Sequence, residues 1–193
     1  GSITIEGVDI REAEHSTQGN KNEYVPQRAL LFSGTIHSNI AFGKSDLDEA
    51  AVAQSADLAM AGTFIGERNE GYDAPVSQGG TNVSGGQRQR LCIARAIVGS
   101  PPILLFDDSF SALDYRTERQ VRQNLRDHLG GSTVLIVAQR ISSILHADQI
   151  LVLDEGRLVG SGSHRYLMEH CPVYRQIASS QLSPQEIEAY GTQ

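Results

Sequence analysis

The second half of the chain alternates short apolar runs with a segment of helical periodicity. Residues 103–106 (ILLF) and 133–137 (TVLIV) lack the alternation of a half-buried strand. Such runs predict strands that are covered on both faces, as in the parallel sheet of an α/β domain. Between them, residues 115–131 place a valine and two leucines on one helical face before a Gly-Gly stop. A strand, a helix and a strand in this order predict a right-handed parallel crossover.

The same reading of periods and turn residues predicts the other elements, with a mostly helical insert between about residues 28 and 88. These elements are a hairpin in residues 1–10, an amphipathic helix over 46–61 with Ser45 as N-cap and Gly62 as stop, a helix over 87–98, a short helix over 140–147, two strands within 149–162 around an Asp-Glu-Gly turn, a helix over 163–182 broken at Pro172, and a frayed tail from 184 onward.

Composition and charge exclude several classes of protein. The 193 residues are 39% hydrophobic, which suits one folded domain or a domain with a subdomain. A formal charge of −7 argues against a broad face for duplex nucleic acid, so we expect no nucleic-acid partner. Cys92 and Cys171 show no disulfide or zinc spacing. No apolar run is long enough to span a membrane, so membrane attachment would need a partner or further sequence.

Two acidic residues close the apolar run over 103–106. Asp107 and Asp108 would lie at the carboxyl end of a parallel strand, which is where ligands of such sheets bind. Adjacent carboxylates repel each other and resist desolvation unless they are paired. They therefore indicate a cation, a proton acceptor or both at this edge of the sheet.

A hydroxyl and two glycines precede the helix predicted over 87–98. Ser84, Gly85 and Gly86 would leave backbone N–H groups at the helix N-terminus open to an anion, with no Cβ atoms on the glycines to hold a phosphate away. Taken alone, the same residues fit a flexible turn about as well.

Five motifs occur in one order: VPQ at 25–27, SGGQ at 84–87, the strand that ends in Asp107 and Asp108, SALD at 111–114, and VAQR at 137–140. Their order and spacing resemble the nucleotide-binding domain of ATP-binding cassette (ABC) transporters, over nearly the whole chain. Residues 31–43, LFSGTIHSNIAFG, resemble the exporter branch. The resemblance implies an α/β P-loop NTPase fold. Its expected parts are a partial RecA-like core over 1–27 and 89–180, a helical signature subdomain over 28–88, and a C-terminal tail over 181–193.

The resemblance also implies a role for each acid and for the glutamine of VPQ. Asp107 would hold Mg²⁺, directly or through water, and Asp108 occupies the position of the catalytic carboxylate. Gln27 would lie near Mg²⁺ and the attacking water. A lone glutamine after proline would otherwise be interpreted as a solvated turn residue.

Two further motifs would act across a dimer. By resemblance, Ser84, Gly85, Gly86 and Gln87 form the signature, which contacts the γ-phosphate of ATP held by a second cassette. Asp114 ends the D-loop of residues 111–114, which crosses the same interface. On its own, SALD could be only a helix start with Asp114 near the cap.

The sequence departs from the family where phosphate is held. It contains no GxxxxGK[ST] loop (Walker A), which the family places ahead of residue 1. SNIAFGKS at 38–45 is a decoy, because Ser38 replaces the first glycine and Ile40 and Phe42 fill a loop that needs small residues.

The catalytic positions differ as well. Asp108 stands where efficient members have Glu, which withdraws the carboxylate by one bond of about 1.5 Å. Gln139 replaces the switch histidine and cannot carry its positive charge. Val83 precedes the signature in place of the usual Leu. Together these changes resemble the degenerate half of a heterodimeric exporter, so the expected partner is a non-identical, catalytically competent cassette.

From the resemblance we expect an ABC-type ATPase cassette of an exporter, with ATP and Mg²⁺ as cofactors and a transmembrane domain that attaches it to the cytoplasmic face of the membrane. The isolated chain is expected to be inactive because Walker A is absent. A non-transport cassette ATPase in DNA maintenance or translation, or a catalytically silent structural partner, remains an alternative.

The remaining charged candidates are not assigned to a functional site. We expect Arg88, Arg90 and Arg95 on a solvated side or paired with acids. We expect ordinary surface or core positions for the histidines, which are His15, His37, His128, His146, His164 and His170.

Overall fold

The computed structural model describes residues 1–12, 22–44, 47–183 and 185–187. Its contacts divide the chain into two compact units, Gly1–Val137 and Ala138–Gln193. The boundaries predicted after residues 27, 88 and 180 stay predictions.

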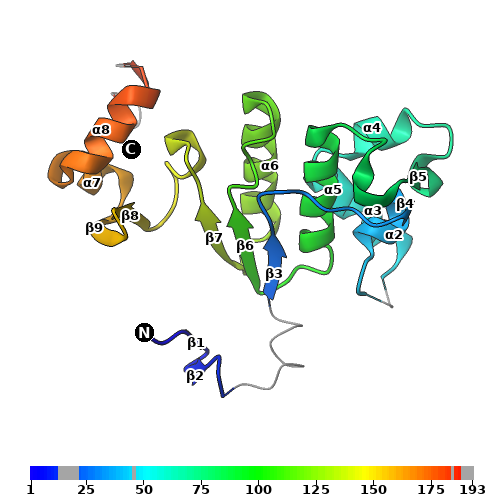
Figure 1. Cartoon of the computed structure of the whole chain (residues 1–193), viewed down its shortest axis with the longest axis horizontal. Coiled ribbons are helices and arrows are strands. Elements are labelled where there is room, and N and C mark those ends of the chain that lie inside the picture. The colour runs from blue at the N-terminus through cyan, green and yellow to red at the C-terminus, as the bar shows by residue number, and fades with distance from the viewer. Residues whose placement is uncertain (13–21, 45–46, 184, 188–193) are drawn as a thin grey trace. The chain divides into compact units, whose positions relative to one another are not determined.

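The described elements of the first unit include the predicted hairpin, strands and helices, and in addition short strands, helices and 3₁₀ turns within residues 22–80 that the pattern did not predict individually (Figure 1). They are β1 (Thr4–Ile5), β2 (Val8–Asp9), β3 (Asn22–Val25), β4 (Gly34–Thr35), α2 (Ile36–Ile40), α3 (Glu49–Leu58), α4 (Gly62–Gly66), the 3₁₀ turn η1 (Gly71–Asp73), β5 (Pro75–Val76), the 3₁₀ turn η2 (Gln78–Gly80), α5 (Gly85–Ile97), β6 (Ile103–Asp107), α6 (Tyr115–His128) and β7 (Thr133–Val137).

A parallel sheet of three strands organises this unit, in the order β3-β6-β7. Val25 lies opposite Phe106, and Asp107 lies opposite Val137. The predicted crossover is confirmed, because α6 connects two parallel neighbours, β6 and β7 (Figure 1). Since parallel strands end at the same edge, the segments after β3 and β6 leave the sheet together.

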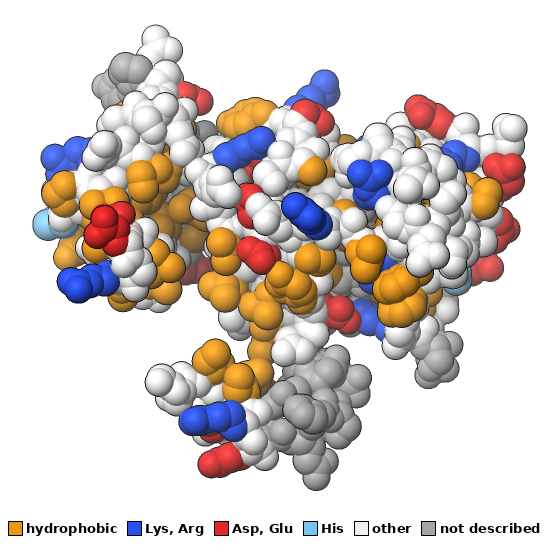
Figure 2. Space-filling model, in the orientation of Figure 1, with side chains coloured by type: hydrophobic (Ala, Val, Ile, Leu, Met, Phe, Trp, Pro, Cys, Tyr) orange, Lys and Arg blue, Asp and Glu red, His pale blue; other side chains and the backbone are white. Residues whose placement is uncertain are grey.

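The prediction that these strands are covered on both faces is confirmed for one face and stays a prediction for the other. In β6, Leu104 and Phe106 are buried in a core that also contains side chains of α5 and α6. The opposite face is open in the described residues, where Tyr24, Leu135 and Val137 are each more than half exposed. Figure 2 shows hydrophobic side chains gathered over the sheet. The unbroken apolar run of such a strand therefore indicates that both of its faces are apolar. The described helices cover one of these two faces.

The helix predicted over residues 46–61 is shorter in the structure, where α3 runs from Glu49 to Leu58. Asp48, rather than Ser45, is the N-cap of α3 and accepts a hydrogen bond from the Ala51 N–H at 2.6 Å, whereas Ser45 lies outside the described residues. Gly62 does not stop this helix but begins α4, because the chain already turns at Met60, where φ is 59°. A carboxylate one turn closer to the apolar positions is the better cap.

The second unit contains η3 (Ile141–Ser143), β8 (Ile150–Asp154), β9 (Arg157–Gly162), α7 (His164–His170) and α8 (Pro172–Gln181). The predicted hairpin is confirmed. β8 and β9 pair antiparallel, and Glu155 and Gly156 both have positive φ, as a tight hairpin turn requires. The predicted break at Pro172 is also confirmed. The helix expected over 140–147 is only the 3₁₀ turn η3, and of the tail only 185–187 are described beyond residue 183.

Candidate functional site

The two acids lie at the carboxyl end of β6, next to the segment that follows β3. The Gln27 side chain donates from Nε2 to Asp108 Oδ2 at 3.1 Å, and the Tyr24 hydroxyl donates to Asp107 Oδ2 at 2.8 Å. The structure thus brings Gln27, Asp107 and Asp108 together, as the family resemblance implies, and adds Tyr24. The hydrogen bond to Asp107 is the main cause that raises the pKa of the Tyr24 phenol, followed by partial desolvation and the negative charge of Asp107.

The backbone turns sharply between the two acids. Asp108 has φ of 45°, a left-handed conformation that costs a non-glycine residue about 1 kcal/mol. Its N–H donates to the Val137 carbonyl at 2.8 Å, and its carbonyl accepts from the Ser111 hydroxyl, also at 2.8 Å. These bonds hold the turn, so the second carboxylate leaves the strand in a fixed direction.

Two buried polar side chains attach the segment after β3 to its neighbours. The Ser109 hydroxyl donates to the Val25 carbonyl at 2.7 Å, and Gln89 of α5 donates to the Pro26 carbonyl at 3.4 Å. Both side chains are about 1% exposed. The end of β3 and the residue before Gln27 are therefore held by Ser109, two residues after β6, and by α5, the helix of the SGGQ motif.

The SGGQ motif caps its own helix. Ser84 is the N-cap of α5: its hydroxyl accepts from the Gln87 N–H at 3.2 Å, and its own N–H donates to Gln87 Oε1 at 3.0 Å. Gly85 and Gly86 form the first turn, whose N–H groups have no acceptor within the helix. The predicted helix N-terminus at this motif is confirmed, but α5 begins at Gly85, two residues earlier than the expected helix over 87–98.

The SALD segment lies against this helix N-terminus. A Cβ atom added to Gly86 would be only 3.5 Å from the Ala112 carbonyl oxygen. Asp114 is the N-cap of α6 and accepts from the N–H and the hydroxyl of Thr117, at 3.0 and 2.6 Å. The hydroxyl bond, and then the backbone bond, hold the pKa of the Asp114 carboxyl below its usual value.

Known proteins are similar in sequence to the chain that forms this site. The family model described as ABC transporter matches residues 1–111. The chain belongs to the ABC transporter family. It is 41% identical, over 94% of its length, to an uncharacterised ABC transporter ATP-binding protein of Mycobacterium tuberculosis, strain H37Rv. It is 42% identical, over 95% of its length, to an ATP-dependent lipid A-core flippase of Saccharophagus degradans.

A solved structure supports the same assignment. A bacterial Atm1-family ABC exporter with ATP bound matches 93% of the chain with a TM-score of 0.89 and 39% sequence identity. The α/β cassette fold is therefore confirmed. The chain spans 31% of the length of both curated relatives and 32% of the solved exporter chain. No helix in the described part of the cassette is long and apolar enough to cross a membrane.

The arginines of α5 correct a sequence prediction. Their guanidinium groups bind backbone carbonyls rather than forming close ion pairs with acids of the described residues, although the charges of Asp114 and Glu23 act on Arg90 and Arg95. Arg88 donates to the Val83 carbonyl at 2.8 Å, Arg90 to that of Met60, and Arg95 to that of Asn39 at 2.7 Å. A long helix that crosses a subdomain of short elements meets many unpaired carbonyls, and arginine supplies several donors on a flexible stem.

Two other residues singled out in the sequence, Lys44 and Gln139, have hydrogen-bond partners of their own. Lys44, the lysine of the decoy motif, donates to the Val98 carbonyl at the end of α5 and forms an ion pair with Glu23 at 3.0 Å. Gln139 belongs to the second unit, where its carbonyl accepts from Gln181 Nε2 at 2.9 Å.

The donor set at the sheet edge fits a magnesium nucleotide. Asp107, Asp108 and Gln27 offer only oxygen ligands, which Mg²⁺ prefers. In the described part of the cassette no three His, Cys, Asp or Glu side chains cluster as a complete metal site. Mg²⁺ is commonly held by one or two carboxylates plus substrate phosphates and water, so a partial protein ligand set is what such a site requires.

Three residues of the site were missed in the sequence: Tyr24, Gln89 and Ser109. The first could have been found from strand alternation, because it shares a face with Leu105 and Asp107 once β3 and β6 are paired. The other two are polar residues in buried positions, and their partners are carbonyl groups that no side-chain pattern marks.

Proposed function

We propose that this cassette binds ATP for an exporter and couples ATP binding and hydrolysis to transport across a membrane. The observation that carries the proposal is the convergence of Gln27, Asp107 and Asp108 at one sheet edge, each within hydrogen-bond reach of a defined partner. The relatives named as a lipid A-core flippase and an Atm1-family exporter support the exporter class.

In this proposal Asp107 holds Mg²⁺, Gln27 lies beside the metal and the reacting water, and Asp108 orients that water. The bound magnesium nucleotide supplies the phosphates that complete the ligand set. Ser84, Gly85, Gly86 and Gln87, with Asp114 nearby, face a second cassette, so each ATP is enclosed by two chains. The closeness of Gly86 to Ala112 supports this role, because one interface could then use both segments.

We further propose that the site formed by Asp108 and Gln139 is degenerate. The Asp108 carboxylate is short by about 1.5 Å relative to glutamate, and it already accepts a hydrogen bond from Gln27. Gln139 offers a neutral amide where a transition state with growing negative charge favours a cation. The partner is then a non-identical, competent cassette, to which this chain contributes its signature.

A transmembrane domain, on the same or another polypeptide, would keep the cassette at the cytoplasmic face of the membrane. The exposed, stacked rings of Phe32 and Phe42, 4.2 Å apart, lie in the segment that resembles exporters and support contact with such a domain. The net charge of −7 argues against a nucleic-acid partner, and therefore against a role in DNA maintenance or translation.

The test uses the assembled transporter in lipid vesicles, with ATP hydrolysis and transport both measured. Ser84→Ala should lower turnover at least tenfold, because it removes a signature contact to the partner's nucleotide. Asp108→Asn should change turnover less than twofold if the site is degenerate, and Asp108→Glu combined with Gln139→His should raise it. The reverse pattern, with Asp108→Asn inactive and Ser84→Ala active, would show that this chain carries the working site.

Two further outcomes bear on the alternatives. Purification of the transporter with an identical copy as the only cassette partner would remove the degenerate-half assignment. A silent structural partner is supported instead if Asp108→Glu with Gln139→His gives no gain while Ser84→Ala abolishes turnover. We also expect the 193-residue chain alone to show no saturable MgATP binding at millimolar nucleotide, and calorimetry that finds submillimolar binding would refute this.

A further inference from the structure

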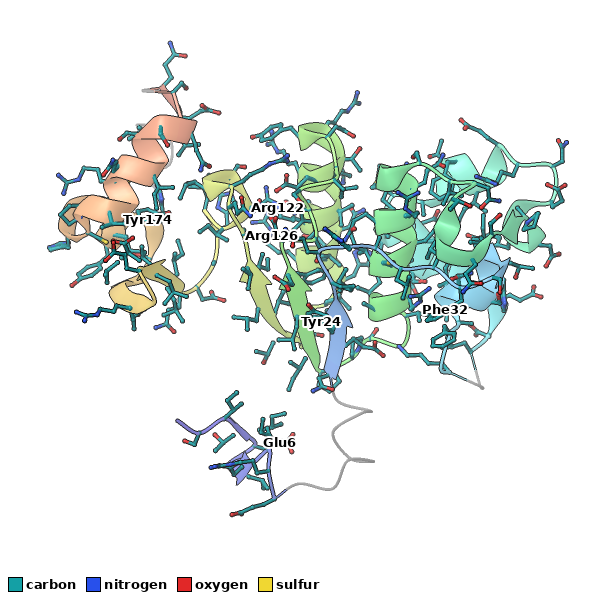
Figure 3. All side chains as sticks on the ribbon, in the orientation of Figure 1. Glu6, Tyr24, Phe32, Arg122, Arg126 and Tyr174 are labelled. Atoms are coloured by element: carbon teal, nitrogen blue, oxygen red, sulfur yellow. The ribbon has the colours of Figure 1, made fainter. Side chains whose placement is uncertain are left out.

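Tyr24 and Asp107 form a hydrogen bond that neither the motifs nor the comparisons assign a role. Tyr24 lies on β3, three residues before Gln27, and is labelled in Figure 3. Its hydroxyl donates to Asp107 Oδ2 at 2.8 Å across the parallel pair β3 and β6. The bond therefore joins the strand that leads to Gln27 with the carboxylate that we assign to Mg²⁺.

The geometry gives the two acids separate restraints. Tyr24 binds one oxygen of Asp107, whereas Gln27 binds one oxygen of Asp108. A carboxylate has two oxygens that can each accept, so a donor on Oδ2 leaves Oδ1 able to act as a ligand. A hydrogen bond on one oxygen also limits rotation of the carboxylate about its last side-chain bond.

Replacement of Tyr24 by phenylalanine keeps the ring and removes only the hydroxyl that bonds to Asp107. Tyr24 is 55% exposed in the described chain, so few described contacts depend on the ring. On an exposed strand surface phenylalanine would be an equally good strand former. The difference between Tyr and Phe at this position is thus mainly the bond to Asp107.

We propose that Tyr24 is a positioning residue for the metal nucleotide: its hydroxyl fixes the orientation of Asp107 so that the other carboxylate oxygen is available to Mg²⁺. This inference rests on the proposed function, because it assumes that Asp107 is the magnesium ligand. Groups that orient metal ligands in this way commonly contribute 10- to 100-fold in metal affinity.

The experiment measures metal binding rather than activity. The assembled transporter, with and without Tyr24→Phe, is titrated with Mn²⁺ in place of Mg²⁺ at saturating ATP analogue, and bound Mn²⁺ is followed by electron paramagnetic resonance. Nucleotide affinity is measured separately in EDTA. Tyr166→Phe is the matched control, because Tyr166 is also half exposed, at 51%, and lies in the second unit.

We expect Tyr24→Phe to weaken Mn²⁺ binding about tenfold, to leave metal-free nucleotide affinity within twofold, and to change the Mn²⁺ spectrum, while Tyr166→Phe changes none of these. Unchanged Mn²⁺ affinity and spectrum in Tyr24→Phe would overturn the positioning role. Equal losses of affinity with and without metal would also overturn it, because they indicate that the hydroxyl supports the structure in general rather than the metal ligand.

A double-mutant cycle tests whether Tyr24 acts through Asp107. If Tyr24 acts through Asp107, then adding Tyr24→Phe to Asp107→Asn should have no further effect on Mn²⁺ affinity, and additive losses would contradict the proposal. Failure of the proposed function gives a different result: the unmodified transporter would then bind no Mn²⁺ that depends on nucleotide, and both inferences would fall together.

Discussion

Asn39 of α2 holds together the segment that follows Gln27, and its replacement by alanine should loosen that segment locally. The side chain is 1% exposed. Its Oδ1 accepts from the Phe32 N–H at 2.9 Å and from Arg95 Nη2 at 2.8 Å, while its Nδ2 donates to the carbonyls of Phe32 at 2.9 Å and Thr35 at 3.0 Å. All donor and acceptor positions point to protein groups.

The magnitude follows from what Asn39→Ala would leave behind. Three neutral hydrogen bonds contribute about 0.5–1.5 kcal/mol each, and the one from the arginine contributes somewhat more. Arg95 retains its hydrogen bonds to the carbonyls of Asn39 and Leu30, at 2.7 and 3.0 Å, so its guanidinium group still has acceptors in the variant. We therefore expect a loss of about 3 kcal/mol in local stability, which is roughly a hundredfold in the local opening equilibrium.

Amide hydrogen exchange read by mass spectrometry tests this number. Peptides over residues 30–42 should exchange roughly a hundredfold faster in Asn39→Ala, with peptides over β6 unaffected. Asn82→Ala is the control, because that side chain also bonds the backbone, to the Ser77 N–H and the Pro75 carbonyl, but is exposed. Equal exchange rates in the two variants would refute the reasoning that burial makes the Asn39 network strong.

Two other predictions concern buried polar groups. Ser109→Ala removes the 2.7 Å hydrogen bond to the Val25 carbonyl and should lower the free energy of unfolding of the first unit by about 1–2 kcal/mol, measured by urea denaturation. A change below 0.5 kcal/mol would show that the carbonyl finds another donor. Burial, and then the charge of His146, lower the pKa of His164, so the unfolded chain binds a proton that the folded one excludes, and stability should fall as pH drops below about 6.5. Thermal melting of the second unit between pH 7.5 and 5 should show this loss, His164→Gln should reduce it, and an equal loss in that variant would contradict the assignment.

The local elements were predictable because their signals are local. The helix start at SGGQ, the cap at Asp114 and the hairpin turn at Glu155-Gly156 each depend on residues within one turn of the chain. The juxtaposition of Gln27 with the two acids was predictable only through resemblance, because strand patterns do not say which strands are neighbours.

The differences between the sequence patterns and the described structure have one physical cause. The burial of β7 and the surroundings of Arg88 and Arg95 are set by what packs against them, and hydropathy carries no information on that. β7 is apolar in sequence yet largely exposed in the described chain, while the two arginines are charged yet are held by backbone carbonyls. A pattern indicates which surfaces could be buried, and the tertiary structure decides which of them are.

The candidate site depends most of all on the register between β3 and β6. Tyr24 reaches Asp107 because Tyr24 pairs with Leu105 and therefore shares its face, whereas Val25 pairs with Phe106 and enters the core. A slip of one residue would exchange these faces, bury the tyrosine and expose the valine. The core pair and the buried hydroxyl of Ser109 on the Val25 carbonyl both oppose that slip. The same contacts that stabilise the sheet thus set the distance from Gln27 to Asp108, so substitutions that loosen this register should impair metal and nucleotide binding without touching a ligand.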